Sequence, residues 1–148
     1  MKFARRLILN FPLLMEAAVM LAIFRVALRI ASFKRIVSWV TPNVPDTRGR
    51  QLASIRRVGW AIRAVSRRSP IEMVCFPQAL AAYAMLKRRH VPATMYYGVA
   101  KAGEKFEAHT WIKAGDHFVV GGEGSERYSV VASFPADGSL ANPLRWTR

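Results

Sequence analysis

The hydrophobic pattern of the first forty residues predicts an amphipathic helix from about Pro12 to Ala31. Residues spaced three or four apart run through it, namely Leu14, Ala18, Leu21, Arg25 and Leu28, and Ala17, Phe24 and Ile30 broaden the stripe. The longest uninterrupted apolar run, Ala17 to Phe24, is shorter than the roughly 18 to 20 residues of a membrane-spanning helix. Pro12 and Glu16 interrupt the apolar part that a signal peptide needs. We expect a helix that packs in the core or faces a partner, with peripheral attachment to an anionic membrane as the alternative.

A second helix is predicted after the punctuated stretch that contains Pro42 and Pro45, with Asp46 or Thr47 as its cap. It runs to about Arg67, and Ser69-Pro70 ends it. Its apolar positions keep the helical period: Leu52, Ile55, Val58, Ala61, Ile62 and Val65. Arginines supply most of the polar surface, so this helix is expected to bury one face and expose a basic one.

The stretch VCFPQALAAYAMLKRRH, residues 74–90, predicts a third helix and contains the only cysteine of the chain. Pro77 is tolerated only in the first turn of a helix, so the helix begins at about Cys75 or Phe76. At that end, unpaired backbone N–H groups and the helix dipole favour a thiolate over a thiol. A buried cysteine that serves only as a small apolar residue is the alternative.

The residues after Val91-Pro92 predict an antiparallel meander. Residues 93–100 are rich in strand formers, residues 101–104 form a turn with Gly103, and residues 106–113 alternate between two faces. Residues 117–120 give a third strand that runs into Gly121-Gly122-Glu123-Gly124, and one more strand is expected around residues 128–134. Because helices precede the strands, the pattern is typical of an α+β fold in which helices pack on an antiparallel sheet.

The composition indicates a basic surface and a reducing environment. The net charge is +14, from 23 Lys and Arg against 9 Asp and Glu, which favours an anionic partner or a solvated basic face. A single cysteine forms no internal disulfide, and no metal-ligating motif is present, so we expect a cytoplasmic protein without a structural metal. We treat residues 1–148 as one domain: a helical part at 1–68, the cysteine helix and meander at 69–134, and a tail at 135–148.

Cys75 and His109 are candidates for a nucleophile and its base. A catalytic thiol needs a group that takes its proton and a third group that orients that base. Of the three histidines, His90 and His117 lie in or beside predicted turns, whereas His109 lies on the second strand with Trp111 on the same face. A structural histidine and a core tryptophan are the alternatives.

These residues also match a known family. The segments C-F-P-Q-A-L, L-K-R-R-H-V-P-A, Y-Y-G-V-A and F-E-A-H-T-W-I-K resemble the leader peptidases of lasso-peptide biosynthesis, which are transglutaminase-like cysteine peptidases with a papain-like fold. The resemblance runs from about residue 56 to residue 122 and extends more loosely to the N-terminal helices. It implies hydrolysis of one peptide bond, which releases the leader from a ribosomally made precursor before a cyclase closes the ring.

The resemblance also implies roles for individual residues. Cys75 would attack the scissile carbonyl, His109 would act as base and then as acid, and no cofactor would be required. The third member of the triad departs from the family pattern, because only Glu123 and Asp116 lie near the expected place. We favour Glu123, since Asp116 lies in a turn that points away from the site. Gln78, three residues after the cysteine, and Trp111 would support the site.

The implied partners are the precursor peptide, a separate leader-recognition protein and the lasso cyclase. We expect a separate recognition protein because 148 residues leave no room for a recognition module beside the peptidase domain. Two rival functions use other chemistry. An acyltransferase would use the same Cys75 and His109 pair with an amine as acceptor. A non-enzymatic basic module would bind nucleic acid or a membrane surface, although the tryptophans form no repeated base-stacking pattern, so no nucleic acid is expected.

Overall fold

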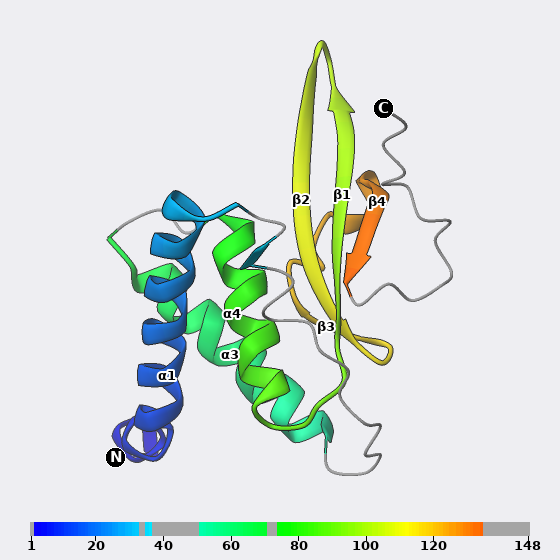
Figure 1. Cartoon of the computed structure of the whole chain (residues 1–148). Helices are drawn as coiled ribbons and strands as arrows, with labels where there is room; N and C mark the ends of the chain where they lie inside the picture. Colours follow the sequence, from blue (N-terminus) through cyan, green and yellow to red (C-terminus); the bar gives the residue numbers. More distant parts are fainter. Residues whose placement is uncertain (1, 33–34, 37–50, 71–73, 135–148) are drawn as a thin grey trace.

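Helices cover one side of an antiparallel sheet in this protein (Figure 1). The computed structural model describes residues 2–32, 35–36, 51–70 and 74–134. In this part of the chain three helices, α1 (Lys2–Ile30), α3 (Gln51–Arg68) and α4 (Cys75–Lys87), precede the strands. The expected α+β class is therefore confirmed. The predicted turn at residues 42–47 and the tail at 135–148 lie outside the described residues.

The sheet has four strands in the order β3-β2-β1-β4. β1 (Thr94–Ala102), β2 (Lys105–Ala114) and β3 (His117–Val120) form the predicted meander, and their bounds agree closely with the pattern of the sequence. A short 3-10 helix, η1 (Ser125–Arg127), then leads to β4 (Ser129–Phe134), which pairs antiparallel with β1. The predicted fourth strand is thus present, and it closes the side of the sheet opposite β3.

The expected start of the first helix, at Pro12, is wrong. α1 begins at Lys2 and continues through Pro12 without a break. Most of the residues before the proline are lysine, alanine, arginine and leucine, which are strong helix formers. The missing N–H and the steric clash of one proline are local costs, and helix formers on both sides of it favour one continuous helix.

The predicted apolar stripe of α1 is buried only in part: Ala17, Leu21 and Phe24 are buried, whereas Ile30 is 81% exposed. The buried positions are Leu13, Ala17, Leu21 and Phe24, whereas Leu14 packs only partly against the core. By length and mean hydropathy alone, residues 10–30 also suffice to cross a membrane, contrary to our expectation from the shorter uninterrupted run. The same test is passed by core helices of soluble proteins and by signal sequences, and the four buried positions pack α1 into this domain.

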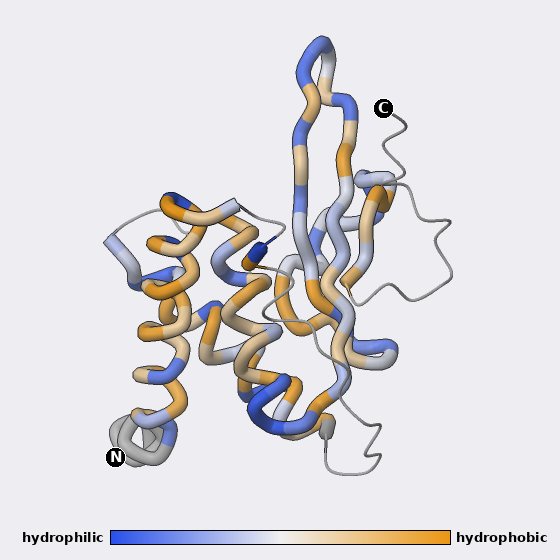
Figure 2. The backbone as a smooth tube through the Cα atoms, viewed as in Figure 1, coloured by the Kyte–Doolittle hydropathy of each residue, from blue (hydrophilic) through white to orange (hydrophobic). Residues whose placement is uncertain are grey.

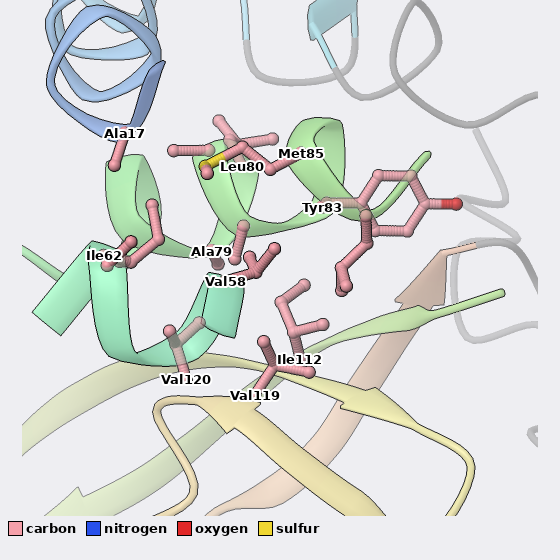
Figure 3. Close-up of a cluster of buried hydrophobic side chains, with 14 of the residues drawn as sticks. Ala17, Val58, Ile62, Ala79, Leu80, Tyr83, Met85, Ile112, Val119 and Val120 are labelled. Atoms are coloured by element: carbon pink, nitrogen blue, oxygen red, sulfur yellow. The ribbon is translucent and has the colours of Figure 1, made fainter. Parts of the chain in front are cut away.

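α4 is the central helix of the core. It carries buried residues along most of its length, between α1 and α3 on one side and the sheet on the other (Figure 3). Met95 and Ile112 supply the facing surface of the sheet, and both are almost fully buried. This packing fixes the first turn of α4, and with it Cys75, relative to β1 and β2.

At Gly59, α3 packs so closely on β3 that no side chain fits at this position. A Cβ atom on Gly59 would lie 2.5 Å from the carbonyl oxygen of Val119. One turn further along, Arg63 donates a hydrogen bond of 2.8 Å to the same carbonyl. The predicted core positions Ile55, Val58 and Ile62 are buried as expected. Leu52 differs from the prediction, because it is largely exposed at the start of the helix.

Candidate active site

Cys75 is the first residue of α4, as the position of Pro77 predicts. Its thiol is free and half-buried. The preceding residue, Val74, is extended and makes no side-chain capping hydrogen bond, and the first turn contains no acidic residue. Backbone N–H groups in the first turn of a helix have no intrahelical partner. The head of α4 therefore offers positive backbone dipoles beside the sulfur, and no acidic residue lies within its first turn.

An aromatic contact places the head of α4 beside the middle of the sheet. The rings of Phe76 and Tyr97 lie with their centroids 5.6 Å apart. Tyr97 pairs with Thr110 across β1 and β2, and the next pair in the register is Gly98 with His109. The cysteine end of α4 and His109 therefore lie at the same level along the β1–β2 pair.

The imidazole of His109 is held by a main-chain carbonyl. Its Nε2 atom lies 2.8 Å from the carbonyl oxygen of Gly121, in the loop after β3. Since a carbonyl oxygen can only accept a hydrogen bond, Nε2 must carry the proton of this bond. In neutral imidazole the other nitrogen, Nδ1, is then unprotonated and basic. This arrangement orients a base without a carboxylate.

Aromatic rings enclose His109 on two sides. The centroid of the Trp111 ring lies 5.8 Å from the imidazole and that of Tyr128 lies 5.1 Å from it. Trp111 also stacks on Tyr96 at 5.8 Å. A Cβ atom on Gly98 would lie 2.8 Å from the Trp111 ring and 2.9 Å from Tyr128. Glycine at position 98 thus allows both rings to close over the strand beside His109.

Strand alternation puts His109 on the face of β2 that points away from the helices. Ile112 belongs to the core cluster that α4 contacts, and successive strand residues point to opposite faces. Trp111 and His109 therefore share the other face. In the described part of the chain, no hydrogen bond joins Cys75 to His109. The structure brings the two residues to one level of the fold but does not show them paired.

Neither acidic candidate orients His109 in this structure. Asp116 lies in the exposed turn between β2 and β3, and Glu123 is exposed in the loop after β3. Neither makes a hydrogen bond or ion pair with a residue that the structure describes. The Gly121 carbonyl instead takes the position that a triad carboxylate would occupy at Nε2.

Little in the sequence indicates this acceptor, because every residue has a carbonyl. Gly121 itself does leave a signal. Its φ angle is 71°, and a Cβ atom there would lie 2.5 Å from the Thr110 carbonyl oxygen, so the loop passes too close to β2 for any side chain. The Gly-Gly pair after β3 is the feature that could have suggested a loop closing over the histidine strand.

The alternation of β2 also puts a carboxylate on the His109 face, which sequence reasoning did not include among the site residues. Glu107 lies two residues before His109, and it accepts a hydrogen bond of 3.4 Å from the Tyr128 hydroxyl.

The supporting residues proposed from the sequence, Trp111 and Gln78, lie in different parts of the fold. Trp111 is buried beside the imidazole, and Gln78 lies half-buried in the first turn of α4. Among the described residues no cluster of three potential metal ligands is found.

Comparison with known families gives one match. The family model of the transglutaminase-like superfamily matches residues 18–133. This match covers most of the chain, so the protein belongs to the transglutaminase-like superfamily, and its helices and antiparallel sheet agree with such a domain. No curated protein and no solved structure matches the chain. The superfamily is generally enzymatic and includes cysteine peptidases and acyltransferases.

Proposed function

We propose that the protein is a cysteine peptidase that removes the leader from a lasso-peptide precursor before macrocyclisation. The observation that carries this proposal is the position of Cys75. It is the only thiol of a transglutaminase-like domain, and it lies half-buried at a helix N-terminus that the Val74 side chain does not cap. The lasso-peptide assignment depends in addition on the segments around Cys75 and His109 that resemble leader peptidases.

In the proposed reaction, Cys75 Sγ bonds to the scissile carbonyl carbon and the C–N bond then breaks. The departing amine takes a proton from the imidazolium, and a thioester remains on the enzyme. Water then attacks the thioester, giving up a proton to the imidazole and releasing the acid product. The backbone N–H groups at the head of α4 are suited to stabilise the oxyanion in both steps.

His109 is the proposed base, acting through Nδ1. The bond from Nε2 to the Gly121 carbonyl leaves Nδ1 as the nitrogen that accepts the thiol proton. Because His109 lies on the face of β2 that points away from α4, the proposal requires a local rearrangement of β2 that brings the imidazole to Sγ when the peptide binds, since rotation of the two side chains does not join them. Catalytic hydrogen bonds often form only in the substrate complex.

Alkylation of the thiol tests the pair directly. Because Cys75 is the only cysteine, the mass gained from iodoacetamide reports on this residue alone. We expect His109→Gln to slow alkylation near neutral pH by about tenfold or more and to move the rate profile to higher pH, since the thiolate loses its cationic partner. His117→Gln, at an exposed position at the start of β3, is the matched control and should leave the profile unchanged. Equal profiles for all three proteins would refute a role for His109.

Processing of the precursor tests the peptidase itself. Cys75→Ala should abolish leader removal when the precursor, the chain and its candidate recognition protein are coexpressed and the products are weighed by mass spectrometry. Retention of full processing by this variant would exclude the cysteine-peptidase proposal. Added amines provide a further readout. A product that is heavier than the hydrolysis product by the mass of the amine minus that of water would assign the chain to acyl transfer instead.

A separate recognition protein is part of the proposal. We expect the isolated chain to bind precursor weakly and to bind it tightly when a leader-recognition protein is present. Titration of labelled precursor with and without that protein measures the difference. Tight binding by the chain alone would contradict this part of the proposal and leave the thiol chemistry untouched.

A further inference from the structure

The outward face of α1 is apolar along most of the helix, and nothing in the described structure covers it. Its large side chains are between 47% and 81% exposed. We call this set the outer stripe: Phe11, Met15, Val19, Ile23, Val26 and Ile30. In Figure 2 most of α1 beyond its first turns has apolar colours, on the side away from the sheet as well as toward it. Contiguous exposed apolar surface of this kind indicates a docking face.

The outer stripe is separate from the core face of the same helix. At 100° per residue, the buried residues Leu13, Ala17 and Leu21 point roughly opposite to Val19 and Ile23. Packing within the domain therefore explains one side of α1 and leaves the other unexplained. The outer side chains carry no hydrogen-bonding group, so a partner that recognises them must do so by apolar contact.

The charge around the outer stripe has one sign. Glu16 is the only acidic residue in the sequences of α1 and α3, and its carboxylate is held by Arg89 and Arg88. α1 also carries Arg25 and Arg29, and α3 carries further arginines. The whole chain has a net charge of +14. Apart from the paired Glu16, the charged residues of α1 and α3 are all cationic, and an apolar face beside them complements a surface that is apolar inside and anionic at its rim.

A groove between α1 and α3 extends this surface. It has a volume of about 840 Å³ and contains Leu14, Ala18 and Ala22 on one wall and Trp60 and Val65 on the other. Arg56, Arg57 and Arg68 also line it, and the described lining contains no acidic residue. Trp60 is 43% exposed there, and tryptophan is favoured where an apolar layer meets polar headgroups.

We propose that the outer stripe of α1 and the arginines beside it bind the surface of an anionic membrane, with α1 lying in the plane of the interface. The apolar side chains enter the boundary between headgroups and acyl chains, and the arginines contact lipid phosphates. α1 does not span the bilayer in this arrangement, because its opposite face forms part of the domain core. The proposal is independent of the chemistry at Cys75.

Vesicle sedimentation with the purified full chain tests the proposal. We compare vesicles of phosphatidylcholine alone with vesicles that contain about one third phosphatidylglycerol. The chain should bind the anionic vesicles, and both high salt and removal of phosphatidylglycerol should weaken binding. Val19→Glu combined with Ile23→Glu should reduce binding to anionic vesicles by about tenfold or more. Val19→Gln combined with Ile23→Gln removes the apolar contacts without adding negative charge, and it should also reduce binding.

The matched control adds the same two negative charges on the sheet, away from the outer stripe. Phe106→Glu combined with Phe118→Glu changes two exposed aromatic residues of the sheet, and it should bind vesicles nearly as well as the native chain. Circular dichroism establishes that each variant folds. Absence of binding to anionic vesicles, or binding that the stripe variants do not reduce, overturns the proposal.

Two other occupants of the outer stripe give distinct results. If the chain forms dimers that the stripe variants dissociate, and vesicles bind nothing, the stripe is a contact between protein chains and the proposal is wrong. If an alkaline carbonate wash fails to release the bound chain, α1 inserts across the bilayer, which also contradicts an interfacial arrangement. Release by carbonate supports it.

Discussion

The two ends of α4 differ in how their backbone groups and charges are satisfied. At the tail, the N–H group of Arg88 bonds to the Ala84 carbonyl, and the Arg89 guanidinium binds the Glu16 carboxylate at 3.0 Å. At the head, Val74 supplies no capping bond and no acidic residue lies in the first turn. An ion pair joins the tail of α4 to α1, whereas the head of α4 places its first backbone N–H groups beside the only thiol of the chain.

This difference separates stability from chemistry along one helix. A capped head would stabilise α4, but the capping oxygen would occupy the donors that an oxyanion needs. An ion pair at the tail holds the helix in place without approaching the sulfur. Changes at the head should therefore alter reactivity most, whereas changes at the tail should alter stability and leave reactivity unchanged.

The largest expected effect comes from an acidic cap at the head. Val74 is exposed and extended, so Val74→Asp can accept a bond from the Phe76 N–H, whereas Pro77 has none to give. The helix should gain up to about 1 kcal/mol of stability. The carboxylate should repel the thiolate and slow alkylation of Cys75 about tenfold or more, which mass spectrometry measures.

Val74→Asn is the matched control for this prediction. Asparagine caps as well as aspartate but carries no charge, so it should raise the melting temperature while alkylation slows much less. If the aspartate and asparagine variants react as fast as the native chain, the head of α4 has no special role at the sulfur.

A smaller effect is expected at the tail. Glu16→Gln keeps the shape of the side chain and removes its charge, which leaves the partly buried Arg89 without its ionic partner. We expect a loss of about 1–2 kcal/mol in the free energy of unfolding, measured with denaturant, and no change in alkylation of Cys75. Glu126→Gln, at an exposed acid without an ion pair in the described structure, should leave stability unchanged. Slower alkylation in the Glu16 variant would show that the two ends of α4 are not independent.

The smallest effect concerns pH. The hydrogen bond from Arg89, aided by attraction to Arg89 and Arg88, lowers the pKa of Glu16 below its ordinary value of 4.5 and outweighs the opposing effect of burial. A carboxyl whose pKa is lower in the folded state stabilises the fold fully above its unfolded pKa, and this contribution is lost as pH falls through the folded value. The stability gap between the native chain and Glu16→Gln should therefore be constant near neutral pH and narrow below about pH 4.5. A gap that stays constant into acid would contradict this account of the ion pair.

Helices and strands were largely predictable because each depends on local signals. Pro77 fixed the start of α4, and the alternation of residues 106–113 fixed β2, since both constraints act within a few residues. The rotation of α1 was not predictable in this way. Both sides of α1 are apolar, so periodicity alone could not tell whether Leu14 or Leu13 points into the core.

The orientation of the candidate base was not predictable either. Glu123 and Asp116 were the natural candidates because an acidic side chain can be identified from the sequence, whereas a particular backbone carbonyl cannot. The acceptor that the structure shows at His109 is the backbone of Gly121, placed there by the pairing of β2 with β3. Strand alternation put His109 and Trp111 on one face, as the sequence indicates, but only the packing of α4 revealed that this face points away from the helices.

By itself the sequence determined the order of the elements, the thiol at the head of a helix and the histidine strand, because proline geometry and residue alternation act locally. Tertiary structure alone decided which side of α1 is buried, what holds the imidazole and which face of the sheet the helices cover. Those outcomes depend on contacts between segments far apart in the chain, where any apolar surface or carbonyl group can serve and no residue type identifies the partner in advance.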